Sequence, residues 1–418
     1  MPLDRSPTTT RPAAAAGDTG ATNWTGVMFG FLLASLAAFQ QFKLPPMLPE
    51  MLAEFSYPKT VAGGFMSIYA VIGLAMSFAL GGMMARIGTG LILGTAFASA
   101  IAGNLLALAM PADVWAVLAS RALEGLAFAV FAIAGPVYTN RNAGAAHLPL
   151  AIALSALWIP VGQIAANLLV PVADATIGWR VAWMATAGAT ALMALWALLI
   201  RARGSADLDL RRRPAATPVP IRSEERWALA LAALLFTLWS AQYFAYMTWL
   251  PQFLVEAHGL EHRMATLAYS VPVLILIVVG LLTSRLIRRG IPVGPMLAGS
   301  MLLQAGVWWA MPWTTRVETG VVSLLLYGVG IGITPVCLFA MPSTILGSKR
   351  AGPGAFATIM TGRNLGVLIG PVLLPLVLTL TDNWSASGPV FGAITTLDAI
   401  GGTLLAIGLA RMGRRGPD

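Results

Sequence analysis

Five charged side chains lie inside long apolar stretches of the sequence, where ionisable groups are costly to keep. They are Lys43, Arg121, Glu124, Arg363 and Asp398. A charge at the centre of a lipid bilayer costs roughly 2.5–3.5 kcal/mol even on the mildest scale, so such groups usually pair or line a polar path. Three cations face two carboxylates. The single positive excess tilts the expected substrate towards an anion.

Arg121 and Glu124 are three positions apart, so they share one face of a helix. We expect Arg121 to contact substrate and Glu124 to carry a proton. A buried structural ion pair is the alternative. Lys43 shares a face with Gln40 and could attract an anion into a cavity, or it could extend its flexible chain to the membrane surface.

Arg363 and Asn364 lie in the middle of a later apolar stretch. Arginine presents a planar fork of donors that suits carboxylate-like anions. We expect Arg363 to contact substrate together with Arg121, one from each half of the chain. The alternative for Arg363 is a salt bridge, with Asp398 as one candidate partner. Asp398 is either a proton site or a carboxyl group buried for packing.

Three polar or aromatic residues, Gln242, Tyr243 and Tyr246, follow one another along a further stretch. Aromatic rings with polar tips suit a small-molecule site. Tyrosine and tryptophan are also common where a helix meets the membrane surface. The sequence leaves both interpretations open for this group.

The elements that position these residues are membrane-spanning helices. The chain has 418 residues, of which 57% are hydrophobic and 10% charged, against about 25% charged in soluble domains. A spanning helix needs roughly 20 apolar residues. Twelve stretches meet this length, at 24–46, 60–82, 90–110, 113–137, 149–172, 179–200, 227–250, 264–286, 292–312, 319–342, 354–380 and 388–410.

Orientation follows from the loops, because lysine and arginine gather on the cytoplasmic side. With the N-terminus inside, 19 of the 26 lysines and arginines are cytoplasmic, 4 are on the other side and 3 lie within helices. We therefore predict that both termini are cytoplasmic, in a bacterial-type inner membrane. The basic residues follow the loops, so no nucleic-acid partner is expected.

The halves of the chain repeat each other. The pattern L-P-x-x-L-x-E occurs at 48–54 and again at 250–256, an offset of 202 residues. Repeated halves that hold the substrate between them near the midplane are a known transporter design. We predict a disordered cytoplasmic tail over 1–23, six-helix bundles over 24–200 and 227–411, a cytoplasmic linker over 201–226 and a tail over 412–418.

Three short motifs resemble those of the major facilitator superfamily. They are G-G-M-M-A-R-I-G at 81–88, R-A-L-E-G at 121–125 and G-W-R at 178–180. The usual acid of the first motif is replaced by Ala85, and in its second copy by Ser284. The resemblance implies an all-α integral membrane protein with twelve helices in two pseudo-symmetric bundles, in which helices 1, 4, 7 and 10 line a central cavity.

Within that superfamily, Tyr243 and the run W-L-P-Q-F at 249–253 are similar to the cyanate/2-nitroimidazole permease group. Ala38 stands near the place of an arginine expected in that group. We predict a secondary transporter of a small, anionic solute. The alternatives are a proton-coupled exporter of neutral or cationic compounds, and a sensor or assembly factor with a transporter fold. We expect a monomer that needs no cofactor or metal and is not an enzyme.

Overall fold

The computed structural model describes residues 21–86, 89–144, 146–169, 177–209, 221–314, 316–347, 350 and 353–414, without the side chains of 76–86, 149, 153, 156, 353, 413 and 414. Within these ranges every regular element is helical. The elements are α1 (Trp24–Phe42), α2 (Leu44–Phe55), α3 (Lys59–Arg86), α4 (Thr89–Ala109), α5 (Val114–Arg141), α6 (Leu148–Asn167), α8 (Arg180–Arg203), α9 (Ser223–His258), α10 (His262–Arg288), α11 (Val293–Ala310), η1 (Met311–Trp313), α12 (Val317–Leu346), α13 (Pro353–Thr381), η2 (Trp384–Ala386) and α14 (Ser387–Arg414).

The helices coincide with the twelve predicted spans, with α1 and α2 together forming the first. Nine segments in the described part of the chain are long and apolar enough to cross a membrane by length and composition. Large apolar side chains point outwards, among them Leu192, Val317 and Leu380, which are 70%, 74% and 77% exposed. Lipid is the solvent that accepts such a surface. The predicted fold class, an all-α integral membrane protein, is confirmed.

The first span is longer than predicted. The helix continues beyond the proline pair, with only a short irregularity at Lys43. α1 ends at Phe42, and α2 begins at Leu44 with Pro45 in its first turn. Proline is tolerated there because the first amide groups of a helix have no helical acceptor. The chain therefore stays helical to Phe55. However, Pro45 has no N–H to offer the carbonyl oxygen of Gln41, one turn back.

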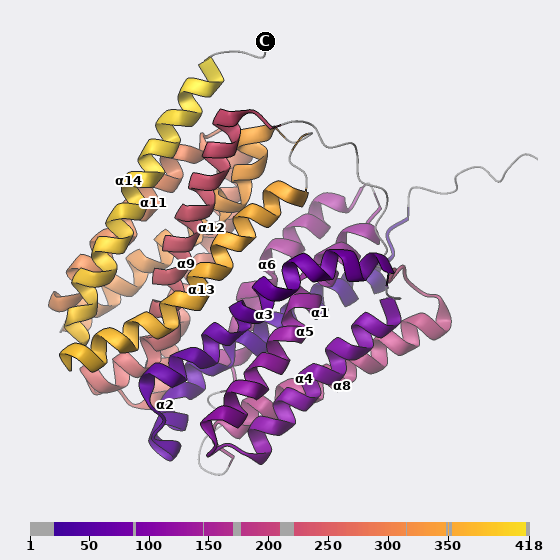
Figure 1. Ribbon diagram of the computed structural model, residues 1–418, viewed down its shortest axis with the longest axis horizontal. Helices are drawn as coiled ribbons and strands as arrows, with labels where there is room; N and C mark the ends of the chain where they lie inside the picture. The colour runs from indigo at the N-terminus through magenta and orange to yellow at the C-terminus, as the bar shows by residue number, and fades with distance from the viewer. Residues whose placement is uncertain are drawn as a thin grey trace, which may run out of the picture.

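Two groups of helices pack among themselves, as Figure 1 shows. In the N-terminal half α5 contacts α1, α3 and α4. In the same half α6 packs on α1, and α8 packs on α4. In the C-terminal half α13 packs on α9, α12 contacts α10 and α11, and α14 packs on α11. The halves meet through α3 with α13, α6 with α10 and α2 with α9.

The helix ends gather at two faces. We call the face that holds Arg203 and Ser223 the linker face, and the face that holds Phe55, Lys59 and His258 the distal face. The linker residues 210–220 and the tail residues 1–20 and 415–418 lie outside the described ranges.

Contacts between the halves occur at the middle of the bundle and towards the distal face. Gly63 on α3 approaches α13 so closely that a Cβ there would lie 2.1 Å from the carbonyl oxygen of Pro371. Four polar contacts accompany this approach, at 2.7, 3.3, 3.2 and 2.9 Å: Lys59 with Glu256, Ser67 with the Val367 carbonyl, Gln163 with Tyr243, and Asn167 with Ser270. The structure is therefore closed at its distal face.

Within the C-terminal half, three glycines let α13 lie against the backbone of α9. Added Cβ atoms at Gly362, Gly366 and Gly370 would lie 2.0, 2.3 and 2.0 Å from carbonyl oxygens of α9. Small residues at such positions allow close helix packing in membranes, where lipid gives helices little apolar drive to associate. The two helices form a tightly joined pair.

Replacing Gly366 by alanine should destabilise the protein, because the two backbones must separate to admit the methyl group. Overpacking of this kind costs about 1–3 kcal/mol. Gly306→Ala on α11 is the control, since no heavy atom lies within 4 Å of its added Cβ. Thermal unfolding in detergent measures both variants. Equal melting temperatures would contradict the close packing of α9 and α13.

Candidate substrate site

Glu124 on α5 is the centre of a buried polar cluster inside the N-terminal half. Its Oε1 accepts from Lys43 Nζ at 2.9 Å, and its Oε2 accepts from Arg121 Nη1 at 2.6 Å and from the Tyr69 hydroxyl at 2.7 Å. The side chains of all three charged residues are 0% exposed. Two cations thus share one carboxylate, which leaves the cluster with one positive charge in excess.

Arg121 closes the gap that the proline pair leaves in the first span. Its Nη2 donates to the carbonyl oxygen of Gln41 at 3.0 Å, and its Nη1 donates to that of Gln40 at 2.9 Å. Its Nε donates to the carbonyl oxygen of Phe65 on α3 at 3.0 Å. Every guanidinium nitrogen of Arg121 has an acceptor in the N-terminal half. These bonds use four of the five N–H groups of the guanidinium, and the side chain is 0% exposed, so Arg121 is held inside its own half in this state.

Lys43 points into the same half and away from the membrane surface. Its Nζ donates to Asn104 Oδ1 at 2.5 Å and to the Thr186 hydroxyl at 3.0 Å, in addition to Glu124. It also lies 4.6 Å from the ring centre of Trp183. The interpretation that Lys43 extends to the membrane surface is wrong, because its side chain is 0% exposed. Gln40 faces the same way and donates to Thr190 on α8 at 3.0 Å.

The C-terminal half has a matching cluster made of neutral groups. Gln242 Oε1 accepts from Trp308 Nε1 at 2.7 Å and from the Tyr327 hydroxyl at 3.0 Å. Gln242 Nε2 donates to Gln304 Oε1 at 2.8 Å. Tyr246 stacks on Tyr327 with 3.8 Å between ring centres. Gln242 and Tyr246 therefore face α11 and α12 inside their own half.

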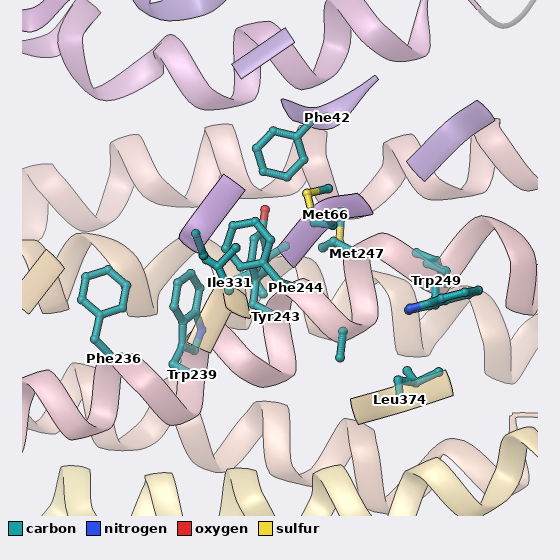
Figure 2. Packing of buried hydrophobic residues seen from close by; sticks show 14 of the residues in the cluster. Phe42, Met66, Phe236, Trp239, Tyr243, Phe244, Met247, Trp249, Ile331 and Leu374 are labelled. Atoms are coloured by element: carbon teal, nitrogen blue, oxygen red, sulfur yellow. The ribbon is translucent and has the colours of Figure 1, made fainter. Parts of the chain in front are cut away.

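Tyr243, one residue along α9, faces the other half instead. Its hydroxyl accepts from Gln163 Nε2 on α6 at 3.2 Å, and Gln163 Oε1 is buried without a hydrogen-bond donor among the described residues. The neighbouring Phe244 stacks against Phe42 of α1, with 5.9 Å between ring centres. Figure 2 shows this region, with Phe42, Tyr243 and Phe244 gathered together. The two halves thus meet here through stacked aromatic rings, with one hydrogen bond, between Tyr243 and Gln163, beside them.

Arg363 lies beside this aromatic surface. Its guanidinium carbon is 5.4 Å from the ring centre of Phe244, and its Nη1 donates to Asn364 Oδ1 at 3.2 Å. Arg363 is 6% exposed, and no carboxylate lies within ion-pair distance of it in the described part of the chain. The salt bridge to Asp398 that was one prediction for Arg363 is not formed. That Arg121 and Arg363 contact one substrate stays a prediction; in this structure Arg121 donates to carbonyl oxygens of its own half.

Asp398 on α14 is also buried and unpaired. It is 0% exposed, and neither carboxyl oxygen has a hydrogen-bond donor among the described residues. One turn along α14, Gly401 lies against Leu235 and Gly402 against Met301. An ionised carboxylate without partners in such surroundings is costly.

A comparison with protein-family models decides the classification. The model of the Major Facilitator Superfamily matches residues 30–371. The chain belongs to the major facilitator superfamily. Its members are secondary transporters in general, and not enzymes. No curated protein matches the chain.

The superfamily motifs fall in different environments. The 121–125 motif supplies Arg121 and Glu124 to the buried cluster, and the 178–180 motif places Trp179 and Arg180 at the distal face. The side chains of the 81–88 motif, including Ala85, lie outside the described residues. No group of three metal-ligating side chains occurs in the described part of the chain.

Sequence reasoning missed the neutral residues that join the charges. Asn104, Thr186 and Tyr69 hold Lys43 and Glu124, and Gln304 holds Gln242. One signal was present, because Asn104 and Gln304 stand 200 residues apart, close to the offset of the repeat. Both are amides on membrane-spanning helices, and each binds a residue of the first span of its half.

Glu124→Gln should destabilise the protein strongly, because it leaves Lys43 and Arg121 buried without their carboxylate. Removing one partner of a buried ion pair costs about 3–5 kcal/mol. Adding Lys43→Met should recover part of this loss, since one uncompensated charge is then removed. The exposed Glu318→Gln is the control. Thermal unfolding that finds the single and double variants equally stable would contradict the coupling of Lys43 with Glu124.

Proposed function

We propose that this protein is a secondary transporter of a small organic anion, which binds between the two halves at Arg363. The carrying observation is that Arg363 is 6% exposed and has no carboxylate partner among the described residues. A buried cation without a counter-charge is costly. An anion that reaches Arg363 removes that cost, and the planar fork of arginine fits a carboxylate with two parallel hydrogen bonds.

The position of Arg363 supports alternating access. Its neighbour Phe244 contacts Phe42 of the other half, so a ligand placed there touches both halves. A ligand drives a conformational change only through interactions that differ between the states. Asn364, Tyr243 and Gln163 offer polar contacts at the same interface. We assign substrate contact to Arg363, Asn364 and Tyr243, and a structural role to Gln40, Lys43, Arg121, Gln242 and Tyr246.

The aromatic neighbours favour an anion with an apolar body over a strongly hydrated inorganic ion. Phe42 and Phe244 form the surface beside the guanidinium, with Met66 and Met247 in the same apolar cluster (Figure 2). A hydrated ion would lose its water against this surface, whereas a planar apolar group replaces one ring contact with another.

We further propose that the linker face is cytoplasmic, in a bacterial-type inner membrane, and that the protein acts as a monomer. The 19-to-4 distribution of lysine and arginine between the two sides supports this orientation. The tail boundaries, 1–23 and 412–418, remain predictions, as do the bundles over 24–200 and 227–411 and the linker over 201–226.

Binding to Arg363 should be visible as thermal stabilisation of the purified protein by benzoate, to a degree that grows with concentration. Nitrate and sulfate at equal ionic strength should stabilise it less. Arg363→Gln should abolish the benzoate effect, and Arg363→Lys should lose most of it because the planar fork is gone. The exposed Arg316→Gln is the matched control. Benzoate stabilisation that survives in Arg363→Gln would contradict the proposal.

A second candidate function is proton-coupled export of neutral or cationic compounds, and Asp398 is the observation that favours proton coupling. A buried carboxyl group with two unpartnered oxygens can take up a proton without breaking a salt bridge. Glu124 is a poorer candidate, because Lys43 and Arg121 both hold it.

Asp398→Asn should therefore abolish accumulation of the solute against its gradient and spare counterflow, in which no net proton movement is needed. Proteoliposomes loaded with the neutral or cationic compound that stabilises the protein most in a thermal-shift screen allow both measurements. Asp382→Asn, an exposed position beyond α13, is the control. Accumulation that persists in Asp398→Asn would place the coupling elsewhere.

A further inference from the structure

The distal ends of the two halves repeat one arrangement, in which a glutamate accepts a hydrogen bond from a tryptophan. In the N-terminal half, Glu54 Oε2 accepts from Trp179 Nε1 at 2.8 Å. In the C-terminal half, Glu256 Oε2 accepts from Trp384 Nε1 at 2.9 Å. The glutamates are 202 residues apart and the tryptophans 205. Each tryptophan precedes the last helix of its half.

The repeat fails at the residue that follows the tryptophan. In the N-terminal half this residue is Arg180, whose Nη2 lies 2.7 Å from Glu54 Oε1, so the half neutralises its own glutamate. In the C-terminal half the same place is taken by Ser385, which has no charge. Glu256 must therefore find its cation elsewhere.

The cation comes from the other half. Lys59, the first residue of α3, lies 2.7 Å from Glu256 and 5.7 Å from the ring centre of Trp384. The repeat offset of 202 places Glu261 at the position that corresponds to Lys59, so the reciprocal contact with Glu54 would join two acids. The charge contact between the distal ends is therefore one-sided, from Lys59 to Glu256.

The Lys59–Glu256 ion pair joins the two halves at the face where they must separate for the distal side to open. A depression of about 400 Å³ opens on the distal face beside it, lined in part by Pro49, Ser56 and Gln252 with Lys59 and Glu256. Pro49 lies on α2, Ser56 directly follows α2, Lys59 begins α3, and Gln252 and Glu256 lie near the end of α9, so both halves form its walls. Opening the distal face separates Lys59 from Glu256, which then keeps Gln252 and Trp384 but loses its cation.

We propose that Lys59 and Glu256 form a gate that holds the distal face closed, and that the absence of an arginine at position 385 creates it. Had position 385 carried an arginine, Glu256 would be neutralised within its own half, as Glu54 is. The distal ends would then separate without exposing an unpaired carboxylate. Ser385 thus sets the balance between the two access states by leaving Glu256 dependent on the other half.

Ser385→Arg tests the gate by restoring the missing half of the repeat. Spin labels at Ala112→Cys and Glu318→Cys, exposed distal positions in opposite halves, report the opening in a Cys337→Ser background. We expect Ser385→Arg and Lys59→Met each to raise the population with the larger distance by about 1.4- to fivefold, the range for an exposed ion pair. Ser385→Gln, of similar length without charge, should have no effect.

The double variant separates the gate from general loosening. In a Lys59→Met background the gate is already absent, so Ser385→Arg should add no further opening. Raising the salt concentration should open the native protein but not Lys59→Met, because salt screens exposed ion pairs. This salt test also serves if Ser385→Arg does not fold. The proposal is overturned if Lys59→Met leaves the distances unchanged, or if Ser385→Arg and Ser385→Gln act alike. Anion binding at Arg363, tested by thermal shift, stands or falls independently.

Discussion

The fold of the N-terminal half depends on one constraint, that backbone carbonyls in lipid must find donors within the protein. Pro45 has no N–H for the carbonyl oxygen of Gln41, and Arg121 donates to that oxygen and to the neighbouring carbonyl oxygen of Gln40. A buried guanidinium needs a counter-charge, which Glu124 provides. Lys43 and Tyr69 also donate to Glu124, one to each carboxylate oxygen. The buried charges of this half thus follow from one missing helical hydrogen bond at Pro45.

The two halves solve the same packing problem with different chemistry. The N-terminal half joins its first span to the neighbouring helices through Lys43 and Asn104, and the C-terminal half does so through Gln242 and Gln304. Neutral amides avoid the desolvation cost of charges. Because both sets are satisfied inside their own halves, neither competes for a ligand. Arg363, near the interface, is left as the buried cation without a carboxylate among the described residues.

Much of the fold could be predicted from the sequence, and so could the identity of the buried charges. The length of each apolar stretch predicts the membrane spans. The free-energy cost of burying a charge indicates that Lys43, Glu124 and Arg363 have a structural or functional role. Their partners could not be predicted, because adjacent helix residues point about 100° apart. Gln242 and Tyr243 are neighbours in sequence, yet one faces α11 and the other faces α6. This step of one residue decides between a structural and an interface role, and it depends on packing that composition does not record.

The glycines of α13 have a mechanical consequence. Because Gly362, Gly366 and Gly370 bring α13 against the backbone of α9, the two helices cannot slide past each other without collisions between main-chain atoms. Arg363 on α13 and Phe244 on α9 are therefore carried as one rigid body whenever the halves rock. The distance between the guanidinium and its ring is preserved, while the distance from that ring to Phe42 is the one that changes. Arg363 and Phe244 thus form one wall of the proposed binding surface and move as a unit, while Phe42 on the opposite wall moves relative to them.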